Sequence, residues 1–417
     1  MIEFSRFELD NGLRVLVHED FSTPLVAVNL LYNVGARDES PERTGFAHLF
    51  EHLMFGGSTN IPNFDEPIQM AGGENNAFTN NDITNFYNIL PAENIETAFW
   101  LESDRMLSIN FSKENLEIQR KVVLEEFKET CLNQPYGDVW HHIADMAYKV
   151  HPYRWPTIGM KPKHLEEASM EEVKTFFYRY YRPNNAILVV SGNATKEKVK
   201  QLAKKWFDNI PRGTFVKKKL PQEPPQKKIE RRIEHARVPV DSLYLAFHVP
   251  GRLHKDYYAI DLLSDVLSNG PSSRLYRRLL KEERLFNHID AYITGNIDPG
   301  LLIIEGKPAE GVSLEQANSA IWSELETLKK EIISDEELLK YKNKVESTLV
   351  FSEINVLNKA INLAFFELLG DPDLINKEKD IYQLVTTEDI RRVAKKFFLK
   401  ENCSELFYKV KLFKNEC

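Results

Sequence analysis

A nearly constant spacing between similar segments constrains the fold of this chain more than any other feature of its sequence. Strand-like and helix-like runs of the first half recur in the same order in the second half. Three matched pairs mark the spacing: Arg37 and Arg252 are 215 positions apart, Gly56 and Gly270 are 214 apart, and Glu172 and Asp389 are 217 apart. Similar helices can recur by chance, but one offset at three separate places predicts a tandem duplication.

The repeat predicts two homologous domains. A chain of 417 residues exceeds what one hydrophobic core usually supports, and two domains of about 200 residues agree with the spacing. Residues 213–230 are rich in proline and lysine and have no apolar periodicity, which is typical of a linker. We therefore expect domains at 1–212 and 231–417.

Periodicity predicts both strands and helices in the first half. Alternating apolar residues indicate strands at 7–18 (a hairpin about Asn11-Gly12), 25–34, 72–79, 84–90 and 186–191. Apolar residues at helical spacing indicate helices at 93–110, 113–131, 170–181 and 196–209. The predicted class is α+β, with antiparallel-rich sheets and helices packed on them.

Residues 45–55 form an apolar helical run that three polar side chains interrupt. On a helix, His48 and His52 lie one turn apart on one face, with Glu51 beside them. Two imidazoles so placed can each give a ring nitrogen to one Zn²⁺, while the carboxylate takes a proton from water. The spelling His-x-x-Glu-His resembles the signature of the inverzincins.

A structural role is the main alternative for these three residues. A single histidine on an apolar helix face is usually a satisfied core residue, but this helix would bury two histidines and a glutamate within about one turn. Burying three polar groups without a purpose is costly, and a bound metal removes that cost. The motif therefore favours a zinc site.

A zinc ion held by two histidines needs a third protein ligand and keeps a fourth position for water. The helix predicted next but one offers carboxylates at Glu125, Glu126 and Glu129. Glu126 follows Val122 by four residues and Val123 by three, which turns it toward the apolar stripe, whereas Glu125 is rotated by about 100°. We expect Glu126 to be the ligand. Glu129 either supports a ligand through a hydrogen bond or belongs to an acidic surface turn.

The second copy of the repeat lacks the metal-binding residues. At the repeat spacing, Leu262, Asp265 and Val266 stand in the places of the two histidines and the glutamate. We therefore expect one Zn²⁺ per chain, held by the first half. The second half would support it, and a substrate site would lie between the halves.

Composition excludes several classes of function. A net charge of −8 gives no electrostatic attraction to nucleic acid or to an anionic membrane, and no apolar run is long enough to span a membrane. Three cysteines are too few for a disulfide framework in a chain of this length. The N-terminus has no apolar signal segment, so we expect a cytoplasmic protein, or a periplasmic one if an export signal was removed.

The motifs together resemble those of the pitrilysin/insulysin family, particularly its shorter bacterial members related to mitochondrial processing peptidase. The matching stretches are His48–His52, Gly72-Gly73, Asn76–Thr79, Val122–Glu126, Arg182–Ala186 and Ser272–Tyr276, with 73 residues between His52 and Glu126. They extend over essentially the whole chain. The resemblance implies two homologous α/β-sandwich domains.

The resemblance also implies a reaction. In this family the two histidines and Glu126 would bind zinc, and Glu51 would be the general base of an endopeptidase that cleaves peptides or unfolded segments inside a chamber. Asn76, Ala77 and Phe78 would form a sheet edge that binds the substrate as an added strand. Two such chains commonly enclose the chamber, so we expect a homodimer, or a heterodimer with a metal-less homologue.

Two places depart from the family's pattern. Many members have a glutamate seven residues before the ligand glutamate, where this chain has Gln119, which can keep a supporting hydrogen bond but not a charge. Members also tend to hold the substrate carbonyl with an arginine and a tyrosine of the second half. The matching stretch, 281–288, lacks that tyrosine and offers Lys281 and Arg284. The alternative is a non-catalytic or partner-dependent peptide-binding subunit with a structural or vestigial metal.

Overall fold

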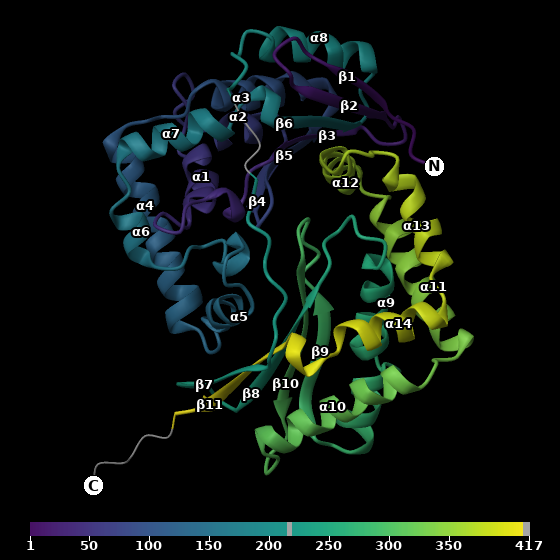
Figure 1. Cartoon of the computed structure of the whole chain (residues 1–417). Helices are drawn as coiled ribbons and strands as arrows, with labels where there is room; N and C mark the ends of the chain where they lie inside the picture. Colours follow the sequence, from purple (N-terminus) through teal and green to yellow (C-terminus); the bar gives the residue numbers. More distant parts are fainter. Residues whose placement is uncertain (215–218, 412–417) are drawn as a thin grey trace. The chain divides into compact units, whose positions relative to one another are not determined.

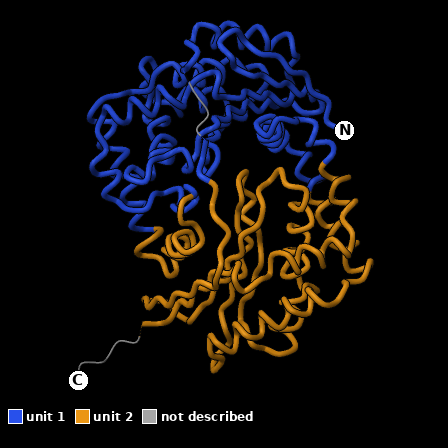
Figure 2. The backbone as a smooth tube through the Cα atoms, viewed as in Figure 1, with its two compact units in different colours: residues 1–129, 151–221, 349–377 blue, residues 130–150, 222–348, 378–417 orange. Residues whose placement is uncertain are grey.

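The computed structural model describes residues 1–214 and 219–411, and the chain divides into two compact units (Figure 2). Unit 1 comprises residues 1–129, 151–221 and 349–377, and unit 2 comprises residues 130–150, 222–348 and 378–417. Each unit has one β-sheet with helices packed on it. The predicted α+β class is confirmed.

The sheet of unit 1 has six strands in the order β1-β2-β6-β3-β5-β4. Their bounds are β1 Ser5–Glu8, β2 Arg14–Glu19, β3 Leu25–Tyr32, β4 Glu74–Thr79, β5 Thr84–Pro91 and β6 Ala186–Gly192. β2 and β6 are parallel, and the other neighbours are antiparallel. The predicted hairpin is confirmed by β1 and β2, whose turn contains Gly12 at φ +89, a conformation that glycine tolerates. β4 ends the sheet, so among the described residues one of its edges has no strand partner.

Helices cover both faces of this sheet (Figure 1). One core contains residues of α1 Phe46–Phe55, α2 Asp65–Met70, α3 Ile95–Leu107, α4 Lys113–Phe127, α6 Pro162–Glu166, α7 Met170–Tyr180 and α8 Lys196–Phe207. The other core contains α12 Val356–Leu369, which packs on β3 and β6. Val28 and Leu30 of β3 belong to the first core, and Ala27 and Leu31 to the second. Because successive side chains of a strand point to opposite faces, β3 is buried on both sides, which explains its continuous apolar sequence.

The sheet of unit 2 repeats this topology with one strand fewer. It has the order β7-β11-β8-β10-β9, with β7 Glu230–Ala236, β8 Ser242–Val249, β9 Phe286–Ile293, β10 Gly300–Pro308 and β11 Cys403–Val410. Numbered along the chain, these strands follow the same order as β2-β6-β3-β5-β4, and β7 and β11 are parallel like β2 and β6. The helices of the second half are α9 Tyr257–Ser268, α10 Leu314–Lys330, α11 Asp335–Ser352, α13 Leu374–Leu384 and α14 Thr387–Phe397, besides α12. The predicted duplication is confirmed.

Each half of the chain contributes one helix to the unit that is built mainly from the other half. α5 Val139–Ala147, from the first half, packs on β8 and β11 in unit 2, as α12 packs on β3 and β6 in unit 1. The first residues of these helices, Val139 and Val356, are 217 positions apart, so the two helices are equivalent in the repeat. A sheet that is apolar on both faces needs cover on both. The predicted domains at 1–212 and 231–417 describe the repeat along the chain and stay a prediction.

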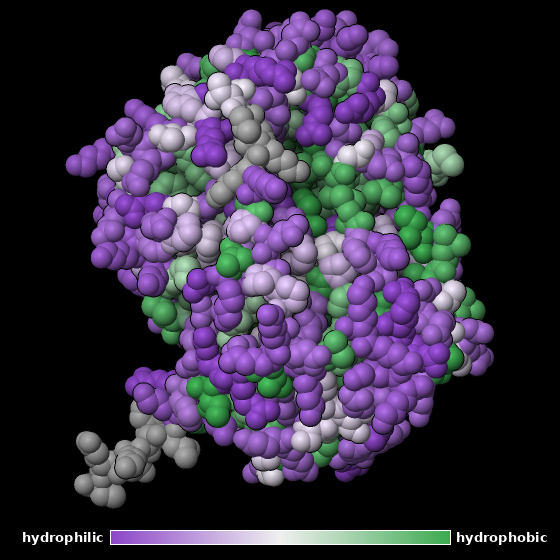
Figure 3. All heavy atoms as spheres, in the orientation of Figure 1, coloured by the Kyte–Doolittle hydropathy of each residue, from purple (hydrophilic) through white to green (hydrophobic). Residues whose placement is uncertain are grey.

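The predicted linker is largely polar, as is the face of the molecule drawn in Figure 3. Residues 219–229 of the predicted linker form no helix or strand, and residues 215–218 lie outside the described residues. Within the described ranges, no single helix is both long and apolar enough to cross a membrane, and α11 and α12 meet that criterion only jointly, across a bend of 110°. Hydrophilic side chains cover most of the face shown in Figure 3.

Candidate metal centre

Helix α1 combines an apolar face with a polar one. Phe50 is fully buried and stacks on Phe176 of α7 at a ring-centroid distance of 5.1 Å. Burying one phenylalanine contributes roughly 1.5–3 kcal/mol, so this contact helps to fix α1 on α7. His48, Glu51 and His52 are only half-buried. Their side chains are therefore available to a ligand while the helix that carries them is held in place.

The packing of α1 on α4 brings the two histidines close to Glu126. Nε2 of His48 lies 3.7 Å from Oε2 of Glu126, and Nε2 of His52 lies 3.3 Å from the same oxygen. One ligand atom from each of these three side chains lies within 4.8 Å of the other two. Among the described residues, this is the one group of three or more such side chains that could hold a metal ion.

The three donors fit the chemistry of zinc. Burial lowers the pKa of His48 to about 4, so its imidazole is neutral near pH 7 and has a lone pair for a metal. A hydrogen bond from His52 lowers the pKa of Glu126, which keeps that side chain an anionic oxygen donor. Nδ1 of His48 is buried and makes no hydrogen bond within the described structure. Nε2 is the ring nitrogen that lies nearest Glu126, so it is the one that would bind the ion.

Glu51 lies beside these three residues but is not one of the converging ligands. Burial raises the pKa of its carboxyl, and Thr79 and His52 act in the opposite direction. Thr79 is the last residue of β4, and α1 packs against that strand. The carboxyl of Glu51 thus faces both the ligand group and the end of the sheet edge.

β4 carries the three residues predicted to bind a substrate. Ala77 packs into the core on the α1 side of the sheet, whereas Phe78 packs against the core on the α12 side. Asn76 is exposed, and its Oδ1 accepts a hydrogen bond from the backbone N–H of Ala77 at 2.8 Å. That N–H therefore points away from β5. The outer edge of β4 has a backbone donor that another strand can use.

Gln119 and Glu129, the residues predicted to support the ligands, lie outside the ligand group. Gln119 is half-buried and Glu129 is exposed. α4 ends at Phe127 and the chain continues as a π-helical segment, Lys128–Asn133. Glu129 is therefore not placed by the α-helical geometry assumed for a helix over 113–131. A supporting role for either residue stays a prediction.

The predicted inward stripe of α4 is partly wrong. Val123 is fully buried, but Val122 is 45% exposed. Two consecutive residues of an α-helix are 100° apart, and here only the second valine faces the core. Glu126 lies on the flank of the buried face, with its side chain 37% exposed. The ligand position follows from Val123 rather than from both valines.

Helix α9 takes the place of α1 in the second half. Leu262 and Val266 are fully buried among apolar residues, where the first half has its histidines. Asp265 accepts a hydrogen bond from Asn269 at 2.6 Å, and burial raises the pKa of its carboxyl to about 6. The second copy therefore uses this helix for packing.

The stretch predicted to replace the family's arginine and tyrosine lies in unit 2. Lys281 belongs to a π-helical segment, Tyr276–Glu282, and its ammonium lies 5.4 Å from the centroid of the Tyr276 ring. Arg284 follows with a φ of +54, a left-handed conformation that residues other than glycine adopt infrequently. A role of Lys281 or Arg284 toward a substrate stays a prediction.

Two residues near the site were not among the predicted site residues. One is Thr79, which lies next to Glu51 and shares a face of β4 with Ala77. The other is Glu39, which is buried and accepts hydrogen bonds from the backbone N–H groups of Gly45 and Ala47. The available signal was a helix that begins after a glycine, and so lacks a capping side chain, with an acidic residue shortly upstream.

Comparisons with known proteins agree with this arrangement. The family model for insulinase (peptidase family M16) matches residues 14–161, and the model for the peptidase M16 inactive domain matches residues 167–345. The zinc protease PqqE of Helicobacter pylori is 29% identical over 409 residues, which cover 96% of this chain and 91% of that protein. A probable mitochondrial-processing peptidase subunit beta of Arabidopsis thaliana is 26% identical over 204 residues, 48% of this chain and 38% of that protein.

A solved structure extends the likeness to the fold. The crystal structure of a protease from Helicobacter pylori has a TM-score of 0.92 at 28% identity and covers 98% of this chain and 100% of its own. The two matched models follow one another along the chain, and the first of them contains both histidines and Glu126. The chain belongs to the insulinase (peptidase M16) family, which is the pitrilysin/insulysin family that its motifs resemble.

Proposed function

We propose that this protein is a zinc-dependent endopeptidase in which His48, His52 and Glu126 bind one Zn²⁺ and Glu51 is the general base. The observation that carries the proposal is the convergence of three ligand atoms within 4.8 Å, from two helices that are far apart in the sequence. Catalytic zinc sites typically have three protein ligands and keep a fourth position for water, whereas structural sites have four protein ligands. The relative named a zinc protease supports the same choice of metal.

When bound, Zn²⁺ supplies Lewis-acid chemistry, which acidifies water and polarises a carbonyl group. The chain supplies the proton transfers. Glu51 lies beside the ligands without joining them, so its carboxylate is free to accept a proton from the attacking water. The same carboxyl can then pass that proton to the amine that leaves.

The outer edge of β4 is the proposed binding site for the peptide. The N–H of Ala77 points away from β5 and is bound by the Asn76 side chain, a contact that an added strand would replace with a backbone hydrogen bond. Backbone bonds hold a peptide with little regard to its sequence. Glu51 lies next to Thr79 at the end of the same strand, so an added strand would pass the general base. Peptides and unfolded segments are the substrates that can adopt this conformation.

The decisive experiment is Glu51→Gln. The amide keeps the shape of the side chain but cannot accept the proton, so we expect one zinc per chain and a fall in kcat of at least about 100-fold. Zinc content is measured by elemental analysis and cleavage with a fluorogenic unstructured peptide. Glu125→Gln is the matched control, because Glu125 is exposed and pairs with Lys128. A Glu51→Gln protein that cleaves as fast as the wild type rules out the proposed role.

A partner-dependent subunit is the second candidate, favoured by the absence of the family's tyrosine from residues 281–288. Activity of the purified chain alone supports a self-sufficient enzyme, whose oligomeric state light scattering determines. Activity that requires a metal-less homologue supports a heterodimer. Zinc retention without cleavage under either condition supports a binding subunit with a structural or vestigial metal.

A further inference from the structure

We propose that Glu39 is a positioning residue for the metal centre. Its carboxyl fixes the first turn of α1 and thereby orients the His48 side chain toward Glu126. The inference rests on the proposed function, because it concerns the same zinc site. It assigns a role to a residue outside the His-x-x-Glu-His motif.

The first turn of α1 cannot be capped by its own N-cap residue. That residue is Gly45, which has no side chain and a φ of +88. A Cβ added there would lie 2.8 Å from the carbonyl oxygen of Ile158, so a capping serine or aspartate does not fit. The first N–H groups of a helix need partners from outside the helix. Phe46 and Ala47 are buried, so water is a poor substitute.

Glu39 supplies the cap from six residues upstream. Its Oε2 accepts a hydrogen bond from the N–H of Gly45 at 2.9 Å, and its Oε1 accepts one from the N–H of Ala47 at 2.8 Å. Glu39 is only 2% exposed. Burial raises the pKa of its carboxyl to about 8, and both oxygens have lone pairs for these bonds in either protonation state. Ala47 directly precedes His48, so the carboxyl holds the backbone of the turn that carries the first proposed ligand.

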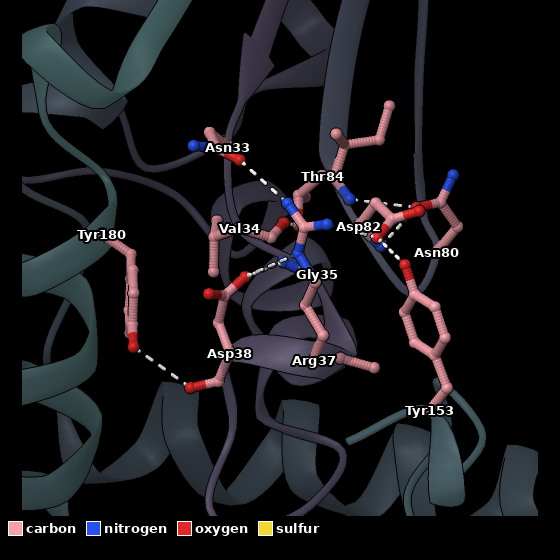
Figure 4. Close-up of polar contacts among 12 residues, drawn as sticks. Asn33, Val34, Gly35, Arg37, Asp38, Asn80, Asp82, Thr84, Tyr153 and Tyr180 are labelled. Carbon is pink, nitrogen blue, oxygen red and sulfur yellow. Dashed lines mark hydrogen bonds and ion pairs between the residues drawn. The ribbon is translucent and has the colours of Figure 1, made fainter. Parts of the chain in front are cut away.

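The backbone just before Glu39 is itself anchored, as Figure 4 shows. Nη1 of Arg37 lies 2.6 Å from Oδ1 of Asp82, in the turn after β4, and the Tyr153 hydroxyl also donates to Asp82. The Tyr180 hydroxyl donates to the backbone carbonyl of Asp38 at 3.1 Å. The Arg37 and Asp82 side chains are 9% and 6% exposed. Breaking such a buried, hydrogen-bonded ion pair is strongly unfavourable, so Glu39 extends from a fixed point.

This anchoring makes Glu39 more than a generic cap. The same ion pair that fixes the loop before Glu39 also fixes the turn that follows β4, so α1 and the proposed substrate edge share one support. Metal ligands must be held to within about 0.5 Å of their productive positions. Mutating residues that orient metal ligands typically costs 10–100-fold in metal affinity or activity.

The test is the zinc affinity of Glu39→Gln. Glutamine keeps one acceptor oxygen, but its amide nitrogen cannot accept an N–H, so one of the two backbone bonds is lost. We expect zinc affinity, measured by competition with a chromogenic chelator at a temperature where the protein is folded, to fall at least tenfold. Glu42→Gln, an exposed position in the same loop, is the matched control and should change the affinity by less than twofold.

Other outcomes overturn the inference. A Glu39→Gln protein with a lower melting temperature without zinc, but wild-type zinc affinity, shows a merely structural cap. If that variant does not fold, hydrogen exchange of the wild-type protein tests the premise of the proposal: the amides of Gly45 and Ala47 should exchange slowly even without zinc, and rapid exchange contradicts the proposal. These readouts do not depend on cleavage, so a failure of the Glu51 experiment remains distinguishable from a failure here.

Discussion

Glu126 reaches the histidines from the margin of its helix rather than from the core. Its side chain is 37% exposed and its Oε2 lies within 3.7 Å of Nε2 of both His48 and His52. A marginal position lets the carboxylate keep its charge with little desolvation, since full burial of a carboxylate is costly. The adjacent Glu125 faces solvent and pairs with Lys128 instead.

This difference predicts the behaviour of two neighbouring variants. Glu126→Gln replaces an anionic ligand with a neutral amide, so we expect zinc affinity to fall at least 100-fold. Glu125→Gln should bind zinc as tightly as the wild type. Elemental analysis after dialysis against a buffered zinc concentration measures both. Equal zinc content in the two variants would show that Glu126 is not a ligand.

Arg284 gives a prediction about stability at the same scale. Its φ of +54 costs a side-chain-bearing residue about 1–2 kcal/mol, whereas glycine tolerates that conformation and pays about 0.5–1 kcal/mol in unfolded-state entropy. Arg284→Gly should therefore stabilise the protein by about 0.5–1 kcal/mol, measured by urea unfolding. Glu283→Gly is the contrast, because Glu283 has a φ of −85 and should be destabilised. A destabilised Arg284→Gly protein would mean that the arginine makes compensating contacts.

Among the elements, α12 is held on the sheet of unit 1 by charge as well as by apolar packing. Nζ of Lys359 donates a hydrogen bond to Oδ2 of Asp20 at 2.6 Å, and Nε2 of His18 lies 3.3 Å from the same Nζ. The bond from Lys359 lowers the pKa of Asp20. A carboxyl whose pKa is lower in the folded state stabilises the fold above its unfolded pKa, near 3.9, and loses that contribution as the pH falls.

Low pH should therefore weaken the packing of α12 on the sheet. Removing Lys359 should make the stability less sensitive to low pH. We expect the urea midpoint of the wild type to be lower at pH 3 than at pH 6. Lys359→Met should lower the midpoint at pH 6 and reduce the difference between the midpoints at the two pH values. Lys377→Met is the control, because Lys377 pairs with Asp371 on the surface and such pairs contribute little. If Lys359→Met leaves the pH dependence unchanged, the ion pair between Lys359 and Asp20 does not contribute to it.

The elements near the site were largely predictable, because periodicity reports which face of a segment is buried. The strands expected at 72–79 and 84–90 are β4 and β5, and the helix expected at 170–181 is α7. Periodicity does not report which surface an element packs on, so the exchange of α5 and α12 between the sheets gave no signal in the sequence. Glu39 was missed because its partners are backbone N–H groups, so its only signal was indirect: a helix that starts after a glycine, with an acidic residue upstream.

At the scale of the molecule, the duplication gives one sheet a helix with two proposed metal ligands and the other a packing helix in the same place. Leu262 and Val266 are fully buried apolar residues where the first half has two histidines whose side chains are 14% and 24% exposed. Losing the ligands therefore leaves a stable hydrophobic contact in the second copy. The first copy retains costly polar groups on its helix, which a metal would satisfy.

Zinc should stabilise unit 1 as a unit, including the part of it that comes from the far end of the chain. All three proposed ligands belong to unit 1, as do residues 349–377, whereas residues 130–150 belong to unit 2 although they closely follow Glu126 in the sequence. A ligand that binds only the folded form at 1,000 times its Kd adds about 4 kcal/mol, and core amides report that gain as slower hydrogen exchange. We expect added zinc to slow exchange in α12 and to leave α5 unchanged, as measured by mass spectrometry of peptic peptides. His48→Ala should abolish the effect in α12. If zinc protects α5 but not α12, the part stabilised by zinc is instead the first half of the chain, up to the linker, rather than unit 1.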